Sequence, residues 1–86
     1  MAYTEGDMGS ELEERELDLE MLREDLMDEL QAINQYQEHI DSLESAEARR
    51  VLEHIRDDEK EHVAELTKLI QKLDPTQAEK FKKEGL

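Results

Sequence analysis

The chain has 86 residues and a mass of 10.1 kDa, which is enough for one small domain. Its 25 acidic residues outnumber 11 basic ones and give a formal net charge of -14. That charge argues against a nucleic-acid partner, because neutralising phosphates requires a basic face. No apolar run approaches the roughly 20 residues of a membrane span, and the acidic beginning does not resemble a signal peptide. Because there is no Cys, we exclude disulfides and thiolate metal sites and expect a cytoplasmic protein.

Three Gly and one Pro are the only strong helix breakers, so the composition predicts an all-α fold. We expect residues 1–9 to form a flexible N-terminal arm without helical periodicity. Ser10, with Glu13 three residues later, has the pattern of a capping box. It predicts a first helix that begins after Ser10 and ends near Leu43.

A short connection then leads to Ser45, which is suited to cap a second helix that ends near Leu73. We expect residues 10–73 to form an antiparallel helical hairpin, because a connection this short returns the chain alongside itself. Residues 74–86 should form a short C-terminal helix and tail, with Pro75 at the first helical position. So small a chain buries a modest core, and a partner or a metal should supply part of its stability.

Apolar residues recur in both predicted helices at alternating spacings of three and four. The stripe consists of Leu12, Leu19, Leu22, Leu26, Ile33 and Ile40 in the first helix, and of Leu52, Ile55, Leu66, Leu69 and Leu73 in the second. Such a stripe packs against another helix at a shallow angle. Polar residues interrupt it at Glu29, Tyr36, Glu59 and His62. An ionised carboxylate in this environment is costly unless it is paired or bound to a cation.

Three of these polar residues, Glu29, Glu59 and His62, are predicted to meet. With the turn centred near Glu44, Glu29 and Glu59 lie equally far from it and therefore face each other. His62 lies one turn further along, at the level of Leu26. Apolar layers should cover this polar layer on both sides, from Leu22, Leu26, Ile33, Ile55 and Leu66.

A Glu-x-x-His motif opposed by a Glu from another helix is half of a dinuclear carboxylate site of the kind found in ferritin-like bundles. Two copies of the chain would supply both halves, so we expect a homodimer that forms a ferritin-like four-helix bundle. Four carboxylates would balance two divalent cations. Oxygen and imidazole ligands suit iron or manganese and tolerate zinc.

Two segments carry a resemblance to a known family. They are Asp28-Glu-Leu-Gln-Ala-Ile-Asn-Gln-Tyr36 and Asp57-Asp-Glu-Lys-Glu-His62, followed less strictly by Leu73-Asp-Pro-Thr-Gln. In these segments, about half of the chain, the sequence resembles the encapsulated ferritin family, two-helix ferritin-like proteins housed in encapsulin shells.

The resemblance implies a ferroxidase that oxidises Fe(II) at a di-iron centre formed between two chains, with O2 or peroxide as the oxidant, and that serves iron storage in a larger compartment. Glu29, Glu59 and His62 would be the iron ligands, two irons per dimer, and Tyr36 would lie beside the centre. The dimers would assemble into a decameric ring, and an encapsulin nanocompartment in the cytoplasm would be the location. Neither nucleic acid nor a membrane is an expected partner.

Family members also hold metal at neighbouring acids just outside the centre. Here Asp28 keeps one acid, but Gln31 and Gln35 replace an acid and a tryptophan, which argues against this outer site. Other peripheral acidic sites could hold calcium. The acidic amino-terminal half reads either as a solvated helix face or as a negative funnel that concentrates Fe(II).

Alternatives from other classes stay open at this point. The chain could be a non-catalytic, metal-binding helical oligomerisation module, stabilised for example by zinc. It could be a helical interaction protein whose polar layer only specifies pairing, with Tyr36 as an ordinary core residue. A rubrerythrin-like peroxidase is a close variant of the ferroxidase, but the chain has no Cys for the thiolate domain that such proteins carry.

Overall fold

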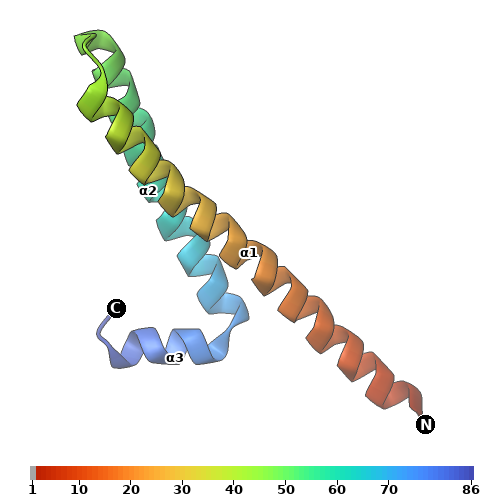
Figure 1. Ribbon diagram of the computed structural model, residues 1–86. Coiled ribbons are helices and arrows are strands. Elements are labelled where there is room, and N and C mark those ends of the chain that lie inside the picture. The colour runs from red at the N-terminus through yellow and green to blue at the C-terminus, as the bar shows by residue number, and fades with distance from the viewer. Residues whose placement is uncertain (1) are drawn as a thin grey trace.

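The computed structural model describes the backbone of residues 2–86 and the side chains of Glu11 and residues 13–86. It contains three helices, α1 (Ala2–Ser42), α2 (Ala46–Leu73) and α3 (Pro75–Lys83). As Figure 1 shows, α1 and α2 run antiparallel side by side, and α3 turns away from the end of α2. The predicted all-α hairpin with a short C-terminal helix is confirmed. No helix in this described part is long and apolar enough to cross a membrane.

The start of α1 differs from the prediction. The helix begins at Ala2, so residues 2–9 are helical and not an irregular arm, and Ser10 lies inside the helix instead of capping it. Gly costs only about 1 kcal/mol relative to Ala within a helix. This segment contains no Pro, so the helix can be extended through it. Extending an existing helix is easier than nucleating a new one, and the extension outweighs the cost of the glycines.

Side-chain contacts in the connection set the hairpin geometry. The Ser45 Oγ atom accepts a hydrogen bond from the Ala48 N–H at 3.1 Å and caps α2 as predicted. The Arg49 guanidinium donates a 2.7 Å hydrogen bond to the Leu43 carbonyl oxygen and so ties α2 to the end of α1. With the connection limited to residues 43–45, the two helices must pack directly against each other.

Asp74 both starts α3 and links it to α1. Its carboxylate accepts a 3.1 Å hydrogen bond from the Gln77 N–H, and Pro75 takes the first helical position as expected. The Arg23 guanidinium of α1 lies 3.0 Å from the same carboxylate. The Gln77 hydrogen bond, supported by Arg23, holds the pKa of Asp74 below its ordinary value of 3.8. This acid therefore fixes the point at which α3 leaves the hairpin.

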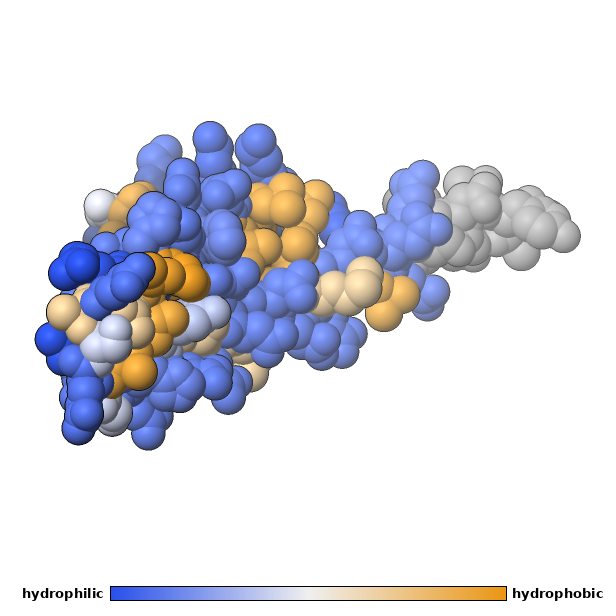
Figure 2. Space-filling view, turned by 90° about the horizontal axis from the view of Figure 1, so that it is seen from above, coloured by the Kyte–Doolittle hydropathy of each residue, from blue (hydrophilic) through white to orange (hydrophobic). Residues whose placement is uncertain are grey.

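A single copy encloses very little core. Among the described side chains only Leu19, Ile40 and Ile70 are buried apolar residues. The molecule extends over 67 × 28 × 14 Å with a radius of gyration of 18.5 Å, whereas a compact chain of this length would have about 12 Å. Figure 2 accordingly shows apolar areas at the surface between hydrophilic side chains.

One predicted stripe position is wrong. Leu69 is 42% exposed, and its neighbour Ile70 is buried at 4% exposure instead. A straight helix has 3.6 residues per turn, so a strict seven-residue repeat rotates by about 20° per heptad. Counted from Leu52, this rotation has turned the seven-residue stripe away from α1 by the end of α2. Ile70, and not Leu69, therefore packs against α1.

The Ser45 cap gives a first test of this architecture. Ser45→Ala should lower the free energy of unfolding by about 1 kcal/mol, because the Ala48 N–H loses its acceptor. Ser45→Asp keeps an acceptor and should retain stability. Denaturation at fixed protein concentration measures the effect, with Ser42→Ala at the end of α1 as the control. Equal losses in Ser45→Ala and Ser42→Ala would contradict the assigned cap.

Asp74 gives a pH-dependent test. Because its folded pKa lies below the ordinary value of 3.8, its contribution is fully present above that value and is lost as pH falls through the folded pKa. Asp74→Asn keeps a capping oxygen but removes the charge that faces Arg23. The parent should therefore be more stable than Asp74→Asn near neutral pH, and the difference should vanish in strong acid. Thermal melting across pH measures it, and a constant difference would contradict the charge-based role.

Candidate metal centre

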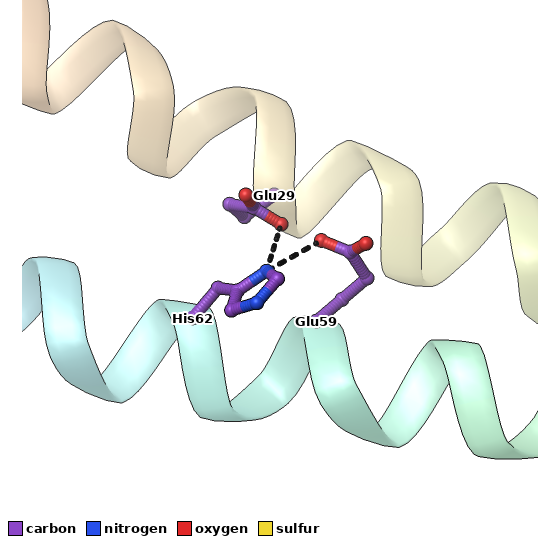
Figure 3. A group of neighbouring side chains, drawn as sticks. All are labelled: Glu29, Glu59 and His62. Atoms are coloured by element: carbon purple, nitrogen blue, oxygen red, sulfur yellow. Dashed lines mark hydrogen bonds and ion pairs between the residues drawn. The ribbon is translucent and has the colours of Figure 1, made fainter.

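Glu29 of α1 and Glu59 and His62 of α2 point toward one another between the two helices, as Figure 3 shows. The His62 Nδ1 atom lies 3.5 Å from the Glu29 Oε2 atom and 3.3 Å from the Glu59 Oε2 atom. One ligand atom from each residue lies within 4.8 Å of those of the other two. The hairpin thus brings together the three residues that the sequence predicted to meet.

The helical spacing explains this convergence. Glu59 and His62 are three residues apart and therefore lie on the same face of α2, one turn from each other. Glu29 comes from the antiparallel helix at the same distance from the turn as Glu59. Because the connection is short and α2 is capped at Ser45, α2 can hardly slide along α1, and the register that places Glu29 beside Glu59 is fixed.

Burial makes the two carboxylates unusual. The side chains of Glu29 and Glu59 are only 25% and 17% exposed. The Glu29 Oε2 atom is buried and has no hydrogen-bond partner. Among the side chains that the structure describes, no lysine or arginine pairs with either acid. A buried carboxylate oxygen without a donor indicates that a cation or a proton belongs there.

His62 Nδ1 makes a long hydrogen bond of 3.3 Å with Glu59 Oε2 and lies 3.5 Å from Glu29 Oε2, and both separations are also compatible with donors around a shared cation. Charge-assisted N–H···O bonds are about 2.7–2.9 Å long, shorter than the 3.3 and 3.5 Å found around His62. Two donors bound at about 2.1 Å to one tetrahedral or octahedral cation lie roughly 3.0–3.4 Å apart. Two carboxylates and one imidazole suit iron, manganese or zinc. The donor set therefore fits a transition-metal site.

One copy offers only part of a coordination shell. His62 is 49% exposed at its side chain, and a groove of about 380 Å³ opens beside it. The groove is lined by Asp25, Asp28, Glu29, His62, Glu65 and Leu66. Three protein donors on one side of an open groove leave the other side free for further ligands.

The other predicted residues occupy less central positions. Tyr36 is half-buried on α1, about 10 Å along the helix from Glu29, and forms no hydrogen bond to the three converging residues. Its role beside the centre stays a prediction. Asp28 lines the groove, whereas Gln31 and Gln35 are exposed and lie outside its lining.

Sequence reasoning missed two acids of the groove. Asp25 lies four residues before Glu29, and Glu65 lies three residues after His62. Both spacings place a residue one turn away on the same side of its helix. A search of positions one turn from each predicted ligand would have found them, but the apolar stripe alone does not include them.

Comparison with known proteins gives two findings. A family model described as EncFtn-like matches residues 5–84. The encapsulin nanocompartment cargo protein EncC of Myxococcus xanthus (strain DK1622) is 48% identical over 50 residues, which cover 58% of this chain and 38% of that protein. The chain therefore matches well under half of the length of this relative.

Replacing one acid tests whether Glu29, Glu59 and His62, the trio, form a metal site. Glu29→Gln removes the negative charge of a buried group that has no donor, so the metal-free protein should keep its melting temperature or gain stability. The variant should lose the stabilisation that metal gives the parent, about 2.7 kcal/mol at a metal concentration 100 times the dissociation constant. Thermal melting with and without Mn²⁺ or Zn²⁺ measures both effects. Glu24→Gln, an exposed acid on α1, is the control, and an undiminished metal effect in Glu29→Gln would contradict the site.

Proposed function

The chain belongs to the EncFtn-like family, and from that membership and the geometry of Glu29, Glu59 and His62 we propose that it is a ferroxidase. Its substrate is Fe(II), oxidised to Fe(III) at a di-iron site shared by two copies of the chain. The single observation that carries this proposal is the convergence of two poorly exposed carboxylates and an imidazole without a cationic partner.

Two copies are needed for both chemical and structural reasons. One copy contributes three donors to an open groove, and its two carboxylates would neutralise only one divalent cation. Two copies related by a two-fold axis supply four carboxylates and two imidazoles, and two Fe(II) ions make the filled centre neutral. The same pairing covers apolar surface that a single hairpin leaves exposed and produces a four-helix bundle.

The ligand charges favour oxidation. Carboxylates bind Fe(III) more strongly than Fe(II), because the attraction grows with the charge of the ion. Glu29 and Glu59 would therefore lower the energy of the oxidised product and make each Fe(II) a better electron donor. Two Fe(II) ions release one electron each, and one O2 with two protons takes up both electrons to give hydrogen peroxide. Peroxide, which would be reduced to water, is the other oxidant compatible with this site.

The neighbouring residues have supporting roles in this proposal. Leu22, Leu26, Ile33, Ile55 and Leu66 are partly buried in one copy and would form the water-poor surroundings of the centre when a second copy covers them. Asp25, Asp28 and Glu65 give the groove a negative lining, which raises the local concentration of Fe(II). Tyr36 would lie at the border of the centre.

Storage of the product requires a larger container, because two hairpins enclose no mineral cavity. The relative from Myxococcus xanthus is named as an encapsulin nanocompartment cargo protein. We therefore place this chain inside an encapsulin shell in the cytoplasm, where metal-centred dimers, joined into rings, oxidise iron that is then deposited in the compartment.

Iron oxidation tests the proposal directly. Glu59→Ala and His62→Ala should each abolish the rise in ultraviolet absorbance that Fe(II) causes in air, because each removes one third of the donors in a half-site. His54→Ala is the control for His62→Ala, since His54 is 77% exposed on the same helix and lies outside the trio. Glu61→Ala, an exposed neighbour of Glu59, is the control for the acid.

Two results would contradict a ferroxidase. Glu59→Ala and His62→Ala could both oxidise iron at the rate of the parent, in which case the assigned residues are wrong. Alternatively, the parent could bind metal at the trio without oxidising Fe(II) faster than buffer does. That second result would favour a non-catalytic metal-binding oligomerisation module, which the donor set also permits because zinc accepts the same ligands.

A further inference from the structure

The free end of α1 concentrates negative charge. Residues 11–20, which we call the acidic end, contain six acidic residues and one arginine, a net charge of -5. Its described side chains are exposed except for Leu19. Figure 1 shows that α1 continues past the point where α2 ends. Leu17 is 57% exposed within this segment and lines a shallow surface together with Glu13, Glu16, Glu20 and Arg23, and the Arg23 guanidinium is paired with Asp74.

The opposite charge gathers where α2 meets α3. Residues 68–86, which we call the lysine end, contain five lysines and three acids, a net charge of +2. The lysines are Lys68, Lys72, Lys80, Lys82 and Lys83. All five are exposed, and none forms an ion pair with another side chain that the structure describes. The lysine end thus offers five cationic groups to a partner.

A groove between α2 and α3 borders the lysine end. It has a volume of about 350 Å³ and is lined by Ala64, Thr67, Lys68, Gln71, Phe81 and Leu86. Phe81 and Leu86 make part of its lining apolar, and Lys68 provides a positive charge at the same place. The groove therefore combines apolar surface with positive charge, as Leu17 and its neighbours combine an apolar side chain with negative charge.

The α3 part of the lysine end, with Lys80, Lys82 and Lys83, does not contact the acidic end of its own chain. Within the described residues, α3 packs only against α2. In Figure 1 the C-terminal end of α3 points away from the N-terminal end of α1. A contact between the acidic end and these lysines of α3 therefore joins different copies.

We propose that the acidic end of one copy docks on the lysine end of a second copy, with Leu17 in the groove between α2 and α3. Glu13, Glu16 and Glu20 would then face lysines, a charge complementarity that directs association and fixes its register. Burial of Leu17 removes an exposed apolar side chain from water. A second copy is the occupant because every copy carries both complementary surfaces.

This contact uses different residues from the candidate metal centre. Leu17 lies twelve residues from Glu29, about 18 Å along α1. The contact can therefore join dimers that are held together at Glu29, Glu59 and His62, and it rests on the proposed function only for the existence of those dimers. Since an assembly needs two different contacts to grow beyond a dimer, the acidic and lysine ends supply the second one.

Charge reversal on each surface tests the contact. Glu13→Lys/Glu16→Lys/Glu20→Lys reverses the acidic end, and Lys68→Glu/Lys80→Glu/Lys83→Glu reverses the lysine end. Each variant alone should lose the assemblies larger than the dimer, because like charges then face each other. An equimolar mixture should restore mixed assemblies, detected by native mass spectrometry with one variant isotopically labelled. Glu24→Lys/Glu38→Lys/Glu53→Lys, three exposed acids elsewhere, is the charge-matched control and should assemble like the parent.

Further measurements separate this contact from the metal centre and from misfolding. Metal content per chain in the same samples reports on the centre, so its loss and the loss of larger assemblies are distinguishable. Restored assembly in the mixture shows that both variants fold. Leu17→Ala should raise the dissociation constant of the larger assembly about tenfold, and salt should weaken that assembly. The proposal is overturned if the parent is never larger than a dimer, if either reversed variant assembles alone like the parent, or if the mixture fails to assemble.

Discussion

The structure depends on two carboxylates placed inside an apolar hairpin without a cationic side chain to meet them. Taking ionised acids out of water is costly, and two of them close together repel each other as well. The nearest titratable group, His62, approaches both at distances longer than a strong hydrogen bond. An external cation would resolve this conflict because it supplies positive charge to several oxygens at once. Metal binding would thus complete a site that is electrostatically unfavourable when alone.

The same incompleteness appears in the packing. Among the described side chains only three apolar residues are buried, and such a core alone cannot offset the conformational entropy of ordering the chain. Its apolar stripe extends beyond what α2 and α3 cover, and its metal centre has donors on one side only. A second copy placed over this face would cover the exposed apolar stripe and supply the missing donors at the same time. Stability, metal binding and assembly would then be coupled, so that loss of one weakens the others.

Much of this could be predicted from the sequence because the governing rules are local. The capping residues Ser45 and Asp74 fix where helices start, and a short connection with a heptad stripe fixes which residues of α1 and α2 meet. The errors have equally local causes. The predicted helix start after Ser10 is too late, because two glycines interrupt a helix only weakly once neighbouring residues are helical. Ile70 replaces Leu69 because a straight helix does not follow a seven-residue repeat. The groove acids Asp25 and Glu65 lie off the stripe on which the prediction was based.

The distribution of charge along the hairpin explains how copies with a net charge of -14 could associate at all. At distances beyond about 10 Å at 0.1 M salt, charges are largely screened, so the local signs at a contact decide more than the total. Around Glu29 and Glu59 a second copy would bring further acids close, and cations would have to mediate that contact. At the lysine end the protein itself provides the positive charge. The contact at Glu29 and Glu59 would then depend on metal, and the contact at the lysine end would depend on salt. A container rich in Fe(II) would favour the metal-dependent contact without weakening the salt-dependent one. The contact at the candidate metal centre and the contact at the lysine end could therefore vary independently of each other, because they use different residues of the same helices.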